Sequence, residues 1–200
     1  MSVSRKATFV VLLAAAVAAL PLRAEQRVLV LDPAASKVSF TLGATGHDVE
    51  GSMALQSGRI AFDPATGAAS GEIAIDLKSA QTGNTSRDKT MHEEVLETPK
   101  YPLAVFHAER LTGTVPASGS GQVALEGILS FHGADHKVKL PAKVDVQNGR
   151  VKAQTQFPIP YVQWGLHDPS ILILRVEKVV SVNVQAEGSL EAGEAPAGVK

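Results

Sequence analysis

Apolar and polar residues alternate along most of the chain with a period of two. In the segment SKVSFTL, for example, Val38, Phe40 and Leu42 share one face and polar residues occupy the other. The same alternation recurs in six further segments, at residues 58–63, 71–77, 121–131, 136–146, 149–157 and 177–188. Turn sequences such as DPATG, NG and HGADH separate them, which is typical of antiparallel strands. About eight such strands predict a β-sandwich or a closed barrel.

The stretch TGNTSRDKTMHEEVLETPKYP breaks this alternation and predicts a helix. The polar residues at 84–86 (Asn-Thr-Ser) can cap a helix, and Thr85 with Asp88 fits a capping box. Two apolar residues four positions apart, Met91 and Val95, lie on one face, and Pro99 ends the helix. The sequence therefore predicts one short helix, around residues 85–97, inserted into a β protein.

The amino end has the parts of a secretory signal peptide in the right order. Basic residues at Arg5 and Lys6 precede an apolar run at 7–20 and a small residue at Ala24. The run is shorter than the roughly 20 apolar residues that a membrane-spanning helix needs. We therefore expect residues 1–24 to be cleaved and the mature form to have no membrane span, with a transmembrane anchor as the alternative.

Composition narrows the function classes. Without the leader, 16 basic residues stand against 20 acidic ones, a net charge of −4. This balance argues against a nucleic-acid-binding protein and against general binding to anionic membranes. Because the chain has no cysteine, disulfides and thiolate chemistry are absent.

We expect a single domain at residues 25–188 and a flexible tail at 189–200.

Four side chains are candidates for enzymatic chemistry. His92, His132 and His136 could ligate a metal, but a zinc site needs three or four converging ligands, and HEEVL lacks the second histidine of the HExxH motif. Ser86 with Lys89 matches the S-x-x-K pair of penicillin-recognising enzymes, without the KTG and SDN partner motifs. No nucleotide-binding fingerprint occurs. We expect no catalytic residue, no bound metal and no cofactor.

The single tryptophan lies in the segment YVQWGLHDPS. Trp164 could be a ligand platform or a core residue, and in a barrel the two surfaces can be the same. His167 and Asp168 could pair with each other, although Asp168 followed by Pro169 also fits a turn.

Several motifs, taken in order, resemble the YceI-like family of exported bacterial proteins. The resemblance runs from about Val28 to about Gly188 and rests on LDPAASKVSF, GRIAFDPATG, IDLKSAQTGNTSRDKTM, KYPLAVF, GILSFHGADHKVKLPAKV and WGL. Its most specific parts are Asp32 to Phe40, the Thr82-Gly83 and Arg87-Asp88 pairs, Tyr101-Pro102 with Phe106, and Gly127 to Gly133. Each is weak alone, and together they are specific.

The resemblance implies a fold and a ligand class. The fold is a lipocalin-like, extended antiparallel β-barrel of about eight strands with the short helix near one end. Members bind long amphiphiles such as polyisoprenoids and isoprenoid quinones. For this chain, the resemblance implies a periplasmic protein that binds a long-chain isoprenoid or fatty lipid inside the barrel. Such barrels can form homodimers, and the sequence does not decide between monomer and dimer.

The alternation then predicts which side chains face the ligand. The expected barrel-lining residues are Phe40, Leu42, Ile73, Ile75, Leu77, Met91, Val95, Phe106, Phe157 and Trp164. Two other functions stay open. One is an exported hydrolase or metal-dependent enzyme that uses Ser86 or the three histidines, and the other is an interaction domain whose barrel is filled by side chains.

Overall fold

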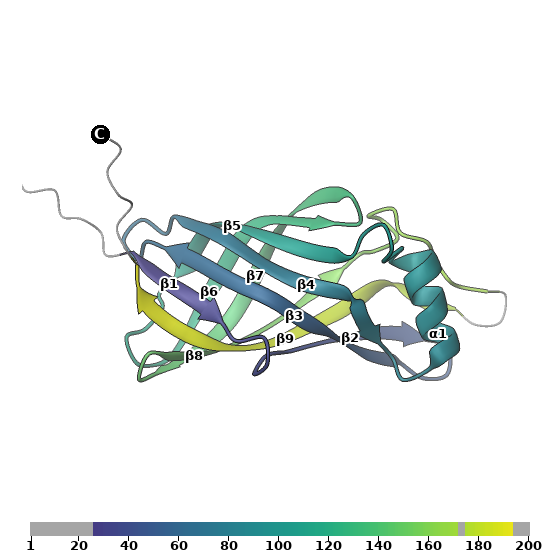
Figure 1. The fold of residues 1–200 in the computed structure, drawn as a ribbon, viewed down its shortest axis with the longest axis horizontal. Helices are drawn as coiled ribbons and strands as arrows, with labels where there is room; N and C mark the ends of the chain where they lie inside the picture. Colours follow the sequence, from purple (N-terminus) through teal and green to yellow (C-terminus); the bar gives the residue numbers. More distant parts are fainter. Residues whose placement is uncertain (1–25, 172–174, 194–200) are drawn as a thin grey trace, which may run out of the picture.

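The computed structural model describes residues 26–171 and 175–193. These form nine strands and one short helix (Figure 1): β1 Arg27–Leu31, β2 Lys37–Ala44, β3 Val49–Phe62, β4 Ala69–Gln81, α1 Thr85–Thr90 continuing as the π-helical turn η1 Met91–Val95, β5 Leu103–Gly113, β6 Gly119–Phe131, β7 Ala134–Gln147, β8 Arg150–Ile159 and β9 Val176–Ala192. The predicted helix is confirmed, and it ends two residues before the expected boundary at 97. Within the described ranges, no helix is long and apolar enough to cross a membrane. The expected signal peptide lies outside them.

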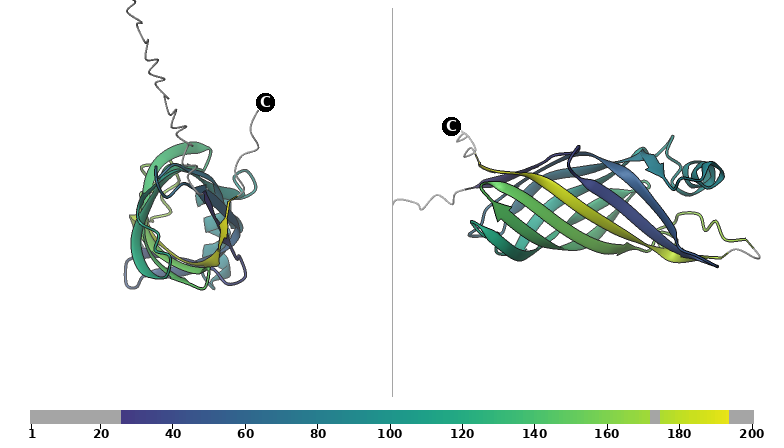
Figure 2. Two further views of the ribbon diagram at one scale, coloured as in Figure 1. Left: turned by 90° about the vertical axis from the view of Figure 1, so that its left-hand side faces the viewer. Right: turned by 90° about the horizontal axis from the view of Figure 1, so that it is seen from below.

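The strands form one closed antiparallel barrel, as predicted. Each strand pairs with at least two others, β3 and β9 pair with three, and the pairing of β3 with β4 closes the sheet. The view along the barrel shows the strands as a continuous ring (Figure 2). Closure satisfies the backbone groups that an open sheet would leave exposed at its edges.

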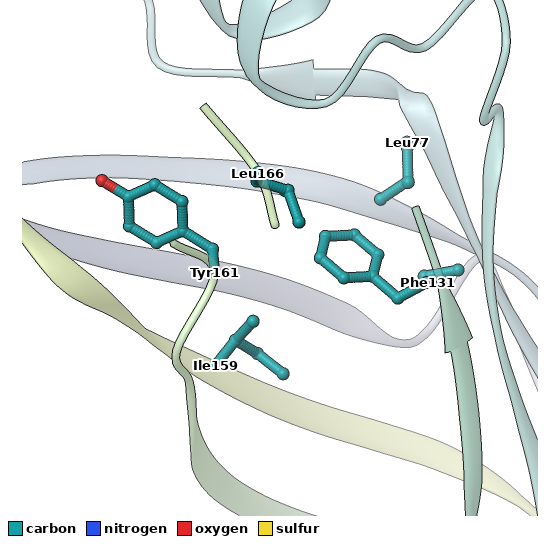
Figure 3. Close-up of a cluster of buried hydrophobic side chains, with 6 residues drawn as sticks. Leu77, Phe131, Ile159, Tyr161 and Leu166 are labelled. Atoms are coloured by element: carbon teal, nitrogen blue, oxygen red, sulfur yellow. The ribbon is translucent and has the colours of Figure 1, made fainter. Parts of the chain in front are cut away.

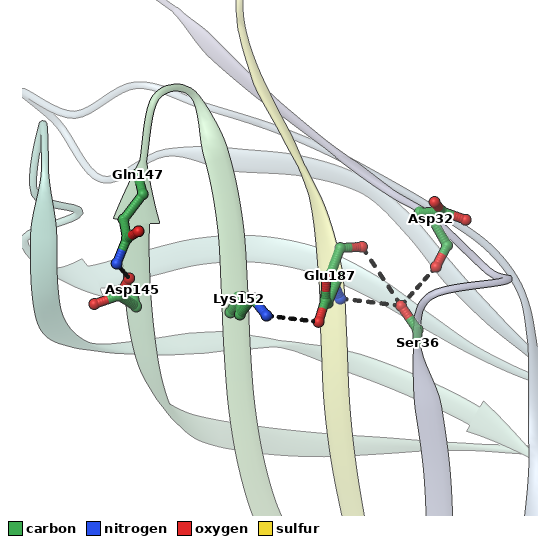
Figure 4. Close-up of polar contacts among 6 residues, drawn as sticks. All are labelled: Asp32, Ser36, Asp145, Gln147, Lys152 and Glu187. Carbon is green, nitrogen blue, oxygen red and sulfur yellow. Dashed lines mark hydrogen bonds and ion pairs between the residues drawn. The ribbon is translucent and has the colours of Figure 1, made fainter.

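Nine strands fill eight positions because β1 and β2 share one position between β3 and β9. β1 pairs with residues 59–62 of β3 and 188–192 of β9, and β2 pairs with residues 49–53 of β3 and 176–185 of β9. The turn between them is held by side chains (Figure 4). Asp32 Oδ1 accepts from Ala34 N at 2.9 Å, and the Ser36 hydroxyl donates to Asp32 O at 2.7 Å and accepts from Glu187 N at 3.1 Å.

The alternation places apolar side chains inside the barrel. A buried cluster near the helix end contains Leu77, Phe131, Ile159, Tyr161 and Leu166 (Figure 3). Ile60, on β3, is 2% exposed and anchors another cluster with Phe106. The core is therefore distributed along the barrel wall, and it encloses an interior cavity.

The β7–β8 ladder covers only part of these strands. Pairing begins at the hairpin, Gln147 with Arg150, and stops at Ala142 with Thr155. Beyond that point each strand carries a proline, Pro141 and Pro158, and proline has no amide hydrogen to donate. The two strands keep their other partners, β6 and β9. The barrel wall is thus unpaired between β7 and β8 toward the helix end.

A β-bulge and the end of β9 depart from simple expectation. Gly127 is regularly paired on β6, and a bulge lies opposite it on β5, between Ala108 and Arg110. Gly127 is required because the His107 carbonyl lies where a Cβ would stand. The last strand runs past the boundary expected at Gly188, since β9 continues to Ala192 and pairs there with β1. The rest of the expected tail, residues 194–200, lies outside the described residues.

Candidate ligand-binding cavity

A chamber of about 850 Å³ occupies the helix end of the barrel. Its walls come mainly from inward-facing positions of β2, β4, β8 and β9, with contributions from β3, β5 and β6, and the helix lies over it. Apolar side chains dominate the walls, among them Val38, Phe40, Leu42, Leu77, Val180 and Val182. We call this space the main chamber. Its surface is suited to hydrocarbon, because apolar area removed from water is the main source of binding free energy there.

The helix contributes three apolar side chains to the main chamber: Met91, Val95 and Leu96. Its first turn is fixed to the end of β4. Asp88 Oδ1 accepts from Thr82 N at 2.8 Å and from the Thr82 hydroxyl at 2.6 Å, and Arg87 Nε donates to Thr82 Oγ1 at 2.8 Å. These bonds hold the helix across the end of the chamber.

Asn84 is the residue that caps this helix. Its side-chain oxygen accepts from Arg87 N at 3.0 Å. The capping box expected between Thr85 and Asp88 does not form, because Asp88 turns back to Thr82. The other end of the helix is tied down by His92, whose Nε2 donates to Ala80 O at 2.9 Å while Nδ1 lies 3.2 Å from Thr98 Oγ1.

Polar side chains line the main chamber only near the helix end, where it reaches the surface. This rim includes Arg87, Glu94, His47, His167 and Arg175, and all of these except Arg87 are exposed. The chamber therefore has an apolar interior and a charged rim, which matches an amphiphile held by its tail.

Asp168 and Tyr161 sit beside the rim. Hydrogen bonds from Ser170, and then the Lys178 ammonium at 3.8 Å, lower the pKa of Asp168. Burial raises the pKa of Tyr161 to about 12, with the Asp168 charge adding to the effect. The Tyr161 hydroxyl donates to Glu177 O at 2.9 Å. His167 and Asp168 lie in the segment between β8 and β9, where Asp168 Oδ1 accepts from Ser170 N at 3.0 Å.

A second, smaller space of about 180 Å³ lies deeper in the barrel, away from the helix. We call it the distal chamber. Thr155 is the only polar residue on its wall, and its buried hydroxyl has no hydrogen-bond partner among the described residues. The two chambers adjoin, since five residues line both: Ile75, Ala104, Leu129, Phe157 and Val184.

The structure places nine of the ten expected lining residues on the chamber walls. Seven line the main chamber: Phe40, Leu42, Ile75, Leu77, Met91, Val95 and Phe157. Two line the distal chamber: Ile73 and Phe106. That a ligand touches them stays a prediction.

Trp164 is the exception, and its assignment to the lining is corrected. It lines neither chamber and follows β8, which ends at Ile159. Its ring stacks on His136 of β7, with centroids 3.8 Å apart and an interplanar angle of 8°, and meets Phe131 edge-on at 6.3 Å. Trp164 therefore packs beside the unpaired part of the β7–β8 wall.

Sequence reasoning missed two kinds of lining residue. Tyr161 and Leu166 line the main chamber from the turn after β8, where no alternation signals a buried face. Leu129 and Val184, by contrast, follow the period-two pattern of their strands, so the sequence already contained the signal for them.

The residues of the enzymatic alternative lie apart in the fold. His92 anchors the helix, His136 stacks on Trp164, and His132 Nε2 lies 2.8 Å from Glu97 Oε2. Lys89, the partner of Ser86 in the S-x-x-K motif, lies 3.9 Å from Glu93. In the part of the chain that the structure describes, no three histidine or acidic side chains gather as metal ligands would.

The fold is shared with several solved structures. Burkholderia cenocepacia BcnA is 22% identical, with a TM-score of 0.64 over 78% of this chain and 98% of that one. A polyisoprenoid-binding domain from Saccharophagus degradans, implicated in plant cell wall breakdown, is 22% identical, with a TM-score of 0.62 over 80% and 97%. The YceI protein of Campylobacter jejuni is 16% identical, with a TM-score of 0.51 over 70% and 80%.

Sequence comparison assigns the family directly. No curated protein matches the chain. A sequence profile of the YceI-like domain matches residues 29–191, from β1 to the last residues of β9. The chain therefore belongs to the YceI-like domain family.

Proposed function

We propose that the protein is an exported, periplasmic binding protein that holds one long-chain amphiphile, such as a polyisoprenoid or an isoprenoid quinone, inside its barrel. Its role is to bury the chain, and it makes or breaks no bond. The observation that carries this proposal is the main chamber of about 850 Å³, whose apolar walls open at a charged rim.

Simple energetics favour a long chain over a short one. Each methylene removed from water contributes about 0.8 kcal/mol. Association costs roughly 4–15 kcal/mol in lost translational and rotational freedom. Ten buried methylenes would supply about 8 kcal/mol and barely offset this cost, whereas 20 would supply about 16 kcal/mol. An apolar chamber with few polar contacts therefore needs a long hydrocarbon to retain its ligand.

Two further observations support the proposal. The solved Saccharophagus degradans relative is described as a polyisoprenoid-binding domain, and its chain matches this fold over nearly its whole length. The basic, apolar and small residues at 1–24 follow the order of a secretory leader, which supports export to the periplasm.

The test is native mass spectrometry of the protein purified from a bacterial periplasm, followed by organic extraction. We expect one long-chain molecule per protein, released by solvent, and its mass identifies the chain. The proposal would be overturned if the purified protein contained no bound lipid and also failed to bind added polyprenol or quinone. Such a result would favour the interaction-domain alternative.

A matched pair of variants links retention to the chamber. Ile75→Asp places a carboxylate on the wall shared by both chambers, so we expect loss of bound lipid. Ser70→Asp introduces the same charge at an exposed position of β4 and should retain lipid. If Ile75→Asp remains folded and carries as much lipid as Ser70→Asp, the chamber is not the binding site.

A further inference from the structure

The two chambers meet at a set of five side chains. Ile75 comes from β4, Ala104 from β5, Leu129 from β6, Phe157 from β8 and Val184 from β9, and each lines both spaces. Ile75 is directly paired with Ala104. Ile75 also packs against two separate buried clusters, one around Leu77 near the helix and one around Leu55 deeper in the barrel. We call these five side chains the waist.

The distal chamber beyond the waist is small and has its own lining. None of the charged rim residues reaches it, and its wall carries apolar side chains except for Thr155. At roughly 30 Å³ per methylene-sized group, the share of a water molecule in the liquid, about 180 Å³ holds about six such groups. This is little more than one isoprene unit.

We propose that the waist and the distal chamber set the length of the chain that the protein selects. This inference rests on the proposed function and adds a specificity determinant to it. The polar group lies at the rim, the chain fills the main chamber, and its last isoprene unit passes the waist into the distal chamber. A chain one unit shorter leaves the distal chamber unused, and a longer one leaves carbons in water at the rim.

The effect on affinity follows from burial. Each methylene that enters the distal chamber strengthens binding about fourfold. Affinity should therefore rise with chain length until the distal chamber is full and then stop rising. The waist side chains make this limit sharp, because a packed barrel wall does not stretch to admit further carbons.

Three variants test the proposal. Ala153→Leu fills the distal chamber, since Ala153 lines it but not the main chamber. Phe157→Ala removes the largest side chain of the waist and joins the two spaces. Gln154→Leu is the control, because Gln154 is exposed on β8 between the inward-facing residues Ala153 and Thr155.

The experiment is competition. Each purified full chain is stripped of lipid and incubated with an equimolar series of all-trans polyprenols that differ by one isoprene unit. Native mass spectrometry then gives the distribution of bound lengths. We expect Ala153→Leu to shift the most abundant length one unit shorter, with at least a tenfold loss for the longest chain that the unaltered protein prefers. Phe157→Ala should shift the distribution to longer chains, and Gln154→Leu should leave it unchanged.

The outcomes separate this inference from the proposed function. If the unaltered protein binds polyprenols but neither chamber variant changes the length distribution, the waist does not select length and the function stands. If the unaltered protein binds neither a polyprenol of this series nor added quinone, both proposals fail. Thermal unfolding shows whether each variant folds. If Ala153→Leu does not fold, a shift of Phe157→Ala to longer chains supports the proposal, and an unchanged or shorter distribution overturns it.

Discussion

Replacing Thr155 by valine should stabilise the protein. The Thr155 hydroxyl is buried without a hydrogen-bond partner among the described residues, and valine removes it while keeping nearly the same shape. A buried group left unsatisfied costs about 1–3 kcal/mol. Because Thr155 lines the distal chamber and is only partly buried as a residue, we expect the low end, a gain of about 1 kcal/mol.

The matched control is a threonine whose hydrogen bond is made. Thr112, on β5, donates its hydroxyl to Ala124 O at 3.3 Å. Thr112→Val removes that bond, so we expect it to destabilise by about 0.5–1.5 kcal/mol. The same chemical change should therefore have opposite signs at the two positions.

Thermal and urea unfolding of lipid-free protein measure both effects. For a domain of this size, a change of 1 kcal/mol shifts Tm by about 2–4 °C. We expect Tm to rise for Thr155→Val and to fall for Thr112→Val. If Thr155→Val lowers Tm as Thr112→Val does, the Thr155 hydroxyl is satisfied in solution, for example by a bound water, and the reasoning is refuted.

Three further predictions follow from the helix and the rim. Asn84→Ala should cost about 1 kcal/mol by removing the helix cap, while Thr85→Ala should cost much less in the same urea titration. His92→Ala should loosen the helix, seen as faster hydrogen exchange from 85 to 95, and unchanged exchange there would contradict the anchoring role. Burial raises the pKa of Tyr161 from 10.0 to about 12, so the stability contributed by its neutral form is complete below about pH 10 and is lost as the pH rises through 12. Ultraviolet titration of the two tyrosines should show a late step that Tyr161→Phe removes; a late step that persists would refute the assignment.

The alternation of side chains was sufficient to predict most of the barrel wall. In Ile73, Ile75 and Leu77 the period of two continues through a strand without interruption, and all three face a chamber. The helix was predictable as well, because its polar start, apolar pair and following proline are local signals.

The failures lie where distant segments decide the outcome. Trp164 follows Pro158 and Pro160, and its position depends on the end of the β7–β8 ladder, which a single strand's pattern does not encode. Asp88 fits a local capping box, yet it bonds to Thr82 because β4 brings that residue within reach. The sharing of one position by β1 and β2 depends on β3 and β9, so it has no local signal.

The position of β9 has a consequence for how the chain folds. β9 pairs with β1, β2 and β8, so the amino-terminal strands acquire their second neighbours only from the carboxyl-terminal one. During synthesis this strand emerges last, and ladders between segments so distant in sequence form slowly. Until β9 arrives, β2 and β8 present open edges that can pair with other chains. We therefore expect truncation before Val176 to produce an aggregating chain, and refolding to be a late, all-or-none closure of the ring.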